Sequence, residues 1–178
     1  MENQRVRITK KLLADSLIHL LGEKNIHKIS VREICDDAGI NRTTFYKHYK
    51  DQYDLLGEIE NNVLILINQN LSINSPESDD LLKLLVFIEE NINLFKILLS
   101  NRIGSNFLEK LLSFTTIQQL IYAQISSEHN EQELSYISDF IIYGGKSIIE
   151  RWIYQENRES PAEIKKLIDV LMGRLLPM

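Results

Sequence analysis

This sequence is poor in the residues that interrupt or cross-link a chain. Its 178 residues include 3 Pro, 7 Gly and a single cysteine, Cys35. One cysteine permits no internal disulfide and no cysteine-based zinc site, so we expect a reducing, cytoplasmic environment. The scarcity of Pro and Gly argues against a loop-rich all-β fold.

Valine and long hydrophobic runs are also scarce. The chain has 26 Leu and 25 Ile against 5 Val, and Leu favours helices whereas Val is enriched in strands. No apolar run exceeds about six residues, far short of the roughly 20 that a membrane-spanning helix needs. Because hydrophobic residues make up 44% and charged residues 25%, we expect a globular, all-α protein that does not enter a membrane.

Positive charge is concentrated in the first fifty residues. Residues 1–50 hold 10 Lys and Arg against 6 Asp and Glu, whereas residues 51–178 hold 10 against 19. Chance clustering is one explanation of this asymmetry. The other is that the basic segment meets a polyanion while the acidic remainder does not.

Apolar periodicity and capping signals predict helices along almost the whole chain. Ser30 and Glu33 have the spacing of a capping box, Gly39 suits a helix C-terminus, and Asn41 suits the next N-terminus. We expect Asn25 to end the first helix in the left-handed conformation. The predicted helices lie at about 7–23, 31–38, 42–49, 52–71, 81–100 with a break near 91–93, 106–127, 132–156 and 161–176.

The two short helices between residues 30 and 49 have the spacing of a helix-turn-helix, whose second helix enters the DNA major groove. Cys35 is placed where the two helices cross, so we interpret it as a small buried residue and not as a redox sensor. The second helix has no acidic residue. Its polar side chains suit base edges and phosphates, although Tyr46 could instead be a packing aromatic. They are Arg42, Thr43, Thr44, Tyr46, Lys47 and His48.

A longer pattern surrounds this motif. It comprises Arg32-Glu33-Ile34, the run AGINRTTFYKHYK at 38–50, and Asp54-Leu55-Leu56. The pattern resembles the signature of the TetR/AcrR family of bacterial transcriptional regulators. The resemblance implies a helix-turn-helix DNA-binding domain at 1–50, followed by a helical ligand-binding and dimerisation domain at 51–178.

The resemblance also implies roles for single residues. Tyr46 and His48 match positions that usually contact phosphates, and Ser30 and Arg32 match positions that touch the backbone or flanking bases. Gln52 stands where the family usually has Lys, a role that Lys50 partly replaces. The full set of implied DNA contacts is Ser30, Arg32, Arg42, Thr43, Thr44, Tyr46, Lys47, His48 and Lys50.

The acidic part of the chain carries no phosphate-binding loop, nucleophile elbow or zinc-protease motif. We therefore expect no enzymatic activity, no cofactor and no metal. TetR-like architecture implies an apolar effector cavity, although a plain helical core would account for most of the aromatic residues. The candidate lining residues are Phe87, Phe95, Phe114 and Tyr122.

Two predicted helices near the C-terminus have wide apolar faces, and Gly144-Gly145 interrupts the first of them. Such a pair is tolerable where another helix must approach closely, so we expect a four-helix bundle between two subunits. Packing within one chain is the alternative. The candidate interface residues are Ile141, Gly144, Gly145, Ile148, Trp152, Ile164, Ile168 and Leu171.

These observations predict a dimeric repressor that binds a palindromic DNA operator and is released by a small apolar effector. The alternative is a DNA-binding regulator that is controlled by a protein partner or has no effector.

Overall fold

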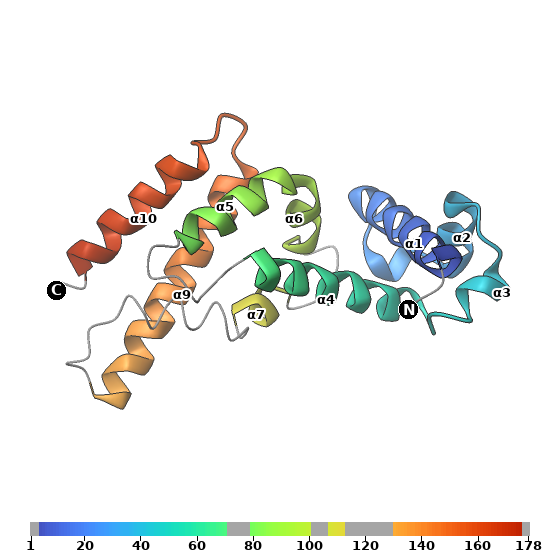
Figure 1. The fold of residues 1–178 in the computed structure, drawn as a ribbon, viewed down its shortest axis with the longest axis horizontal. Helices are drawn as coiled ribbons and strands as arrows, with labels where there is room; N and C mark the ends of the chain where they lie inside the picture. The colour runs from blue at the N-terminus through green and yellow to red at the C-terminus, as the bar shows by residue number, and fades with distance from the viewer. Residues whose placement is uncertain (1–3, 71–78, 101–106, 113–129, 176–178) are drawn as a thin grey trace. The chain divides into compact units, whose positions relative to one another are not determined.

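The computed structural model describes residues 4–70, 79–100, 107–112 and 130–175, which are helical and contain no strand (Figure 1). The predicted all-α class is therefore confirmed for the residues described. None of the helices in these ranges is long and apolar enough to cross a membrane. The chain divides into two compact units, of which the first extends to Val63 and also takes in a short segment that begins at Ile97.

The first unit contains α1 (Gln4–Glu23), the 3-10 helix η1 (Ile26–Lys28), α2 (Val31–Ala38), α3 (Arg42–Phe45) and the first part of α4 (Gln52–Asn70). Its core is formed by Leu13, Leu17 and Leu21, which lie on one stripe of α1 and are fully buried. The buried hydroxyl of Ser16 donates to the carbonyl of Ile34 at 3.0 Å. This bond ties α1 to α2 beside the apolar contacts.

Two local predictions in this unit are wrong. Asn25 is extended, with φ −70° and ψ 148°, and it caps η1 instead of ending α1 in the left-handed conformation. The extended backbone lets Ile26 enter the core, where it is 3% exposed. The helix predicted at 42–49 ends at Phe45, because the next residues tighten into a turn in which His48 N–H donates to the carbonyl of Phe45 at 2.9 Å.

The second unit contains the remainder of α4, α5 (Asp80–Glu90), most of α6 (Ile92–Leu98), α7 (Phe107–Leu112), α9 (Glu131–Tyr154) and α10 (Pro161–Leu175). The predicted break near 91–93 is confirmed at Asn91, whose side chain donates to the carbonyl of Phe87 at 2.9 Å. Of the helix predicted at 106–127, only α7 lies within the described residues.

The helices α5 and α10 pack against each other in the second unit. Lys165 of α10 lies 3.4 Å from Asp79, the residue that caps α5. The hydrogen bond that the Lys165 ammonium donates to Asp169, 2.6 Å away, raises the pKa of Lys165. The negative charges of Asp169 and Asp79 raise this pKa further. At the start of α10, the Glu163 carboxylate accepts hydrogen bonds from both the N–H and the hydroxyl of Ser160 at 2.8 Å.

Candidate nucleic-acid interface

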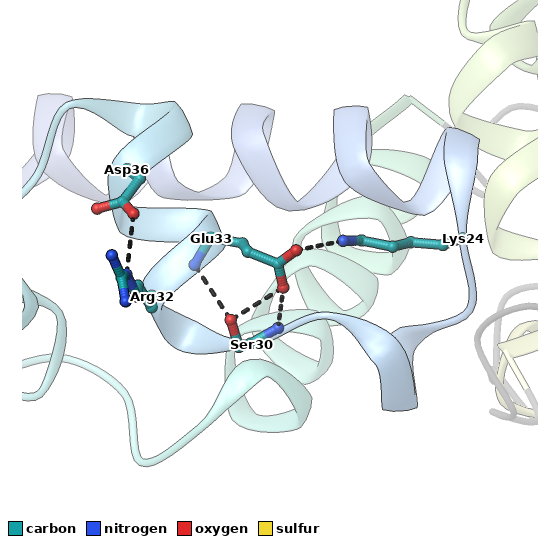
Figure 2. Close-up of polar contacts among 5 residues, drawn as sticks. All are labelled: Lys24, Ser30, Arg32, Glu33 and Asp36. Carbon is teal, nitrogen blue, oxygen red and sulfur yellow. Dashed lines mark hydrogen bonds and ion pairs between the residues drawn. The ribbon is translucent and has the colours of Figure 1, made fainter.

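The start of α2 is held by a capping box (Figure 2). Ser30 accepts a hydrogen bond from Glu33 N–H at 3.3 Å, and the Glu33 carboxylate accepts bonds from both the N–H and the hydroxyl of Ser30 at 2.9 Å. The same carboxylate binds the ammonium of Lys24. Five groups therefore converge at the point where α2 begins: the N–H and hydroxyl of Ser30, the N–H and carboxylate of Glu33, and the ammonium of Lys24.

These contacts determine the electrostatics of the corner. The Lys24 ammonium first, and then the backbone and hydroxyl donors of Ser30, lower the pKa of Glu33 to about 2. Glu33 is therefore ionised at neutral pH and neutralises Lys24 within the protein. The hydroxyl of Ser30 is occupied by the cap, so its expected contact with DNA stays a prediction.

The short helix α3 is fixed by its two neighbouring turns. Gly39 ends α2 in the left-handed region, with φ 66°, where a residue with a side chain would be strained. Asn41 then caps α3 by accepting from Thr43 N–H at 2.8 Å. Phe45 is fully buried and its ring meets that of Tyr49 at 5.5 Å. The packing of Phe45 leaves the opposite side of α3 exposed.

Most predicted contact residues lie on α3 or in residues 46–50, which follow it. Arg42, Thr43, Lys47 and Lys50 are exposed, whereas Thr44 and His48 are half-buried. Tyr46 is 59% exposed, so the alternative that it is a core aromatic is wrong. The end of α2 and α3 together border an open hollow of about 660 Å³. Its lining residues are Cys35, Asp36, Ile40, Asn41, Arg42, Thr43, Tyr46 and Lys47.

The thiol of Cys35 is 2% exposed, and burial raises its pKa. A thiol that is both buried and protonated reacts slowly, because the thiolate is the reactive form. This finding agrees with the interpretation of Cys35 as a small packing residue.

The end of the α3 turn is connected to α1 and α4. Tyr49 donates its phenol hydrogen to Glu58 of α4 at 3.0 Å, and Lys10 of α1 lies 3.1 Å from the other oxygen of the same carboxylate. Asp51 caps α4 by accepting from Tyr53 and Asp54 N–H groups, both at 2.9 Å. These bonds fix the first turns of α4 relative to the helix-turn-helix.

Comparison with protein families agrees with this geometry. A model of bacterial regulatory proteins of the tetR family matches residues 14–59, which span α1 to the first turns of α4. A second TetR model, described as the transcriptional regulator C-terminal region, matches residues 78–174, more than half of the chain. The chain belongs to the TetR family of transcriptional regulators.

Individual relatives are more distant. The TetR chain is 38% identical over 85 residues to the transcriptional activator DhaS of the dhaKLM operon of Lactococcus lactis subsp. lactis, covering 47% of this chain and 45% of DhaS. It spans about half the length of the curated relatives it matches.

Solved structures extend the likeness over nearly the whole fold. A TetR regulator from Streptococcus agalactiae 2603V superposes with a TM-score of 0.73 at 18% identity, covering 95% of this chain and 96% of that one. The dihydroxyacetone kinase operon activator DhaS superposes at 0.63 with 24% identity, covering 94% and 96%. At these identities the structures show the TetR fold alone.

Only two of the predicted effector residues of this TetR protein lie among the described residues. Phe95 is 1% exposed and its ring meets the rings of Phe87 and Phe107 at 6.0 and 6.4 Å. These three side chains form an aromatic cluster in the second unit. Phe114 and Tyr122 lie outside the described residues, so the effector cavity stays a prediction.

The predicted interface residues differ in how deeply their side chains are buried. Trp152 and Ile164 are 1% and 4% exposed, and Trp152 donates to the carbonyl of Glu159 at 2.6 Å. These two side chains therefore pack within the subunit. Leu171 is 37% exposed. Ile141, Gly144, Gly145, Ile148 and Ile168 are half-buried.

The sequence reasoning missed three polar residues near the proposed DNA surface. Asp36 lines the hollow, while Lys10 and Glu58 meet at the Tyr49 junction. Asp36 also pairs with Arg32, whose Nε lies 3.4 Å from Asp36 Oδ2. Opposite charges four residues apart on one helix are a signal that could have indicated this pair. The Lys10–Glu58 pair joins residues that are distant in the sequence, so no local pattern indicates it.

Proposed function

We propose that this TetR regulator binds a palindromic operator as a dimer, represses transcription there, and is released by a small apolar effector. In this proposal, residues 1–50 form the DNA-binding domain and residues 51–178 bind the effector and dimerise. The protein acts in the cytoplasm as a regulator and not as an enzyme. The observation that carries the proposal is the exposed surface of α3 and of the turn after it, which offers Arg42, Thr43 and Lys47 and has no carboxylate.

Each type of exposed side chain has a distinct proposed role. Arg42 and Thr43, with Thr44, lie at the start of α3 and read base edges in the major groove. Arginine can form two hydrogen bonds to guanine, which discriminate by about 1–3 kcal/mol. Tyr46, Lys47, His48 and Lys50, with Ser30 and Arg32 at the start of α2, contact phosphates or flanking bases. Phosphate contacts position the protein but carry little sequence information.

The proposed dimer uses α9 and α10. Leu167, Val170 and Leu171 of α10 are 47%, 41% and 37% exposed, and three- and four-residue spacings place them on one face. Among the described residues, a Cβ atom built on Gly144 or Gly145 would meet nothing within 4 Å. Two residues without side chains suit the close approach of a partner helix, with Trp152 and Ile164 supporting the interface from inside the subunit.

Two parts of this proposal, release by an effector and repression, each have an alternative. Control by a protein partner, or no effector at all, would explain a second unit whose aromatic cluster is simply a packed core. Activation is a second candidate direction, because the relative DhaS is named as a transcriptional activator. Transcription measured in vitro from the operator, with and without the protein, distinguishes repression from activation.

The decisive experiment is a DNA titration. Selection from a random duplex library gives the operator, and binding of Arg42→Ala and Lys50→Ala is then measured against operator variants at several salt concentrations. We expect Arg42→Ala to relax preference at one base pair per half-site. Lys50→Ala should weaken all sequences alike and reduce the salt dependence. Lys166→Ala, which changes an exposed lysine of α10, is the control.

The outcomes separate the possible roles of these residues. If Arg42→Ala leaves base preference unchanged, Arg42 contacts phosphate and its assignment as a base reader is wrong. If neither substitution changes DNA binding relative to Lys166→Ala, the proposed recognition surface is wrong.

A further inference from the structure

An exposed acidic residue lies within the proposed DNA-contact surface. Asp36 stands one helical turn after Arg32 on α2, and its carboxylate Oδ2 lies 3.4 Å from Arg32 Nε (Figure 2). The two side chains are 70% and 74% exposed. A pair so exposed contributes little to stability, so its contribution to the fold does not explain why a carboxylate stands here.

The geometry of the pair matters for what Arg32 can still bind. A guanidinium has five N–H donors in a planar fork. The hydrogen bond to Asp36 uses Nε, and the two terminal nitrogens take no part in it. Those two nitrogens form the edge that binds guanine O6 and N7 together. Asp36 therefore restrains Arg32 without occupying that edge.

The position of Asp36 agrees with such a role. Asp36 lines the same hollow as Arg42, Thr43 and Lys47. A fixed negative charge at this place repels phosphates, which dominate non-specific binding. The carboxylate would thus weaken the phosphate contacts that DNA of any sequence offers. At the same time it holds Arg32 in an orientation that can bind one guanine.

We propose that Asp36 is a specificity-determining positioning residue, which holds Arg32 for bidentate contact with a guanine and disfavours binding to DNA without that guanine. The inference rests on the proposed DNA-binding function. It adds Asp36 to the DNA surface and assigns Arg32 to a guanine, where the proposed function left phosphates and flanking bases open.

The neighbouring residue provides a matched control. Asp37 carries the same charge on the same helix, but its carboxylate lies 3.2 Å from His19 Nδ1 of α1 and does not border the hollow. Asp36→Ala and Asp37→Ala therefore remove equal charge from adjacent positions. Asp36→Glu keeps a carboxylate four residues from Arg32, and Arg32→Ala removes the side chain that Asp36 restrains.

The experiment measures binding of the full-length protein to its selected operator, to operators with each guanine replaced, and to a random-sequence duplex. For Asp36→Ala we expect tighter binding to random DNA, by about twofold, and a loss of discrimination at one guanine per half-site of up to about fivefold, the most that an exposed ion pair supplies. Arg32→Ala should lose preference at the same guanine, and adding Asp36→Ala to it should cause no further loss. Asp36→Glu should restore most of the discrimination.

Three results would overturn the inference. Equal effects of Asp36→Ala and Asp37→Ala would show that the loss of any negative charge on α2, and not the contact with Arg32, causes the change. Loss of preference at different base pairs in Asp36→Ala and Arg32→Ala would show that the two residues do not act together. Failure of Asp36→Glu to restore discrimination would exclude positioning by the carboxylate. If the unaltered protein binds no duplex specifically, the proposed function itself fails, which is a different outcome from these three.

Discussion

The junction of Tyr49, Glu58 and Lys10 allows a quantitative test of how the helix-turn-helix is attached to α4. Tyr49 is 4% exposed and donates to a Glu58 carboxylate whose side chain is 35% exposed. The change Tyr49→Phe removes the hydroxyl but keeps the ring, over which the Lys10 ammonium lies 5.9 Å from the centroid. Among the contacts described here, the change therefore removes the hydrogen bond to Glu58.

The magnitude follows from the environment of this bond. Hydrogen bonds to charged groups contribute about 1.5–3 kcal/mol, and partial exposure of Glu58 places this one at the lower end. We expect Tyr49→Phe to lower the free energy of unfolding by about 1.5 kcal/mol, which corresponds to roughly 3–6 °C in Tm for a chain of this size. Glu58→Gln keeps an oxygen that can accept from Tyr49 and loses only the ion pair, so it should cost about 0.5 kcal/mol.

Urea unfolding followed by circular dichroism measures both changes, and an unchanged m-value shows that the same surface is exposed in each variant. Tyr53→Phe is the control, because Tyr53 is a 50% exposed tyrosine of α4, the helix that carries Glu58. The reasoning is refuted if Tyr49→Phe is as mild as Tyr53→Phe. It also fails if Glu58→Gln costs more than Tyr49→Phe, since the ion pair would then outweigh the phenol bond.

Three further predictions follow from the contacts described above. Glu33 has a folded pKa of about 2 against an ordinary value of 4.5, so its stabilising contribution is complete above pH 4.5 and should be lost as the pH falls towards 2; the change Lys24→Met should flatten this acid dependence in unfolding titrations. Cys35 is the single cysteine of the chain, and its buried thiol should react with Ellman's reagent at the rate of protein opening; rapid labelling of the native protein would contradict its burial. The changes Ile148→Arg and Leu171→Arg should shift the mass measured by light scattering from about twice 20.8 kDa towards 20.8 kDa, and a monomeric unaltered protein would exclude the proposed dimer.

Capping residues were predictable because their signals are local. Ser30 with Glu33, Gly39 and Asn41 each act within four residues of their own position, and the structure confirms all of them. The all-α class followed from composition for the same kind of reason, since helix preference sums over many residues. These local signals were sufficient to predict the helix-turn-helix and the family pattern around it.

The predictions that failed depend on burial at a distance. Asn25 has a residue type that tolerates the left-handed conformation, but its backbone is determined by the need to bury Ile26 and Ile29, which are 3% and 2% exposed. The end of α3 is similarly determined by Tyr49, whose burial requires a turn after Phe45. Propensity is a weak guide where tertiary packing selects the backbone.

The position of the domain boundary depends both on local sequence and on packing between distant residues. Residue 50 marks the end of the basic segment, and the family resemblance implied a division between 1–50 and 51–178. Packing continues beyond that point, because Tyr49 and Lys10 both bond to Glu58 and the first compact unit extends to Val63. A change in the direction of α4 would therefore act directly, through Tyr49, on α3 and the turn that follows it. If an effector regulates DNA binding through α4, Tyr49→Phe should weaken that coupling while leaving the base contacts of Arg42 intact.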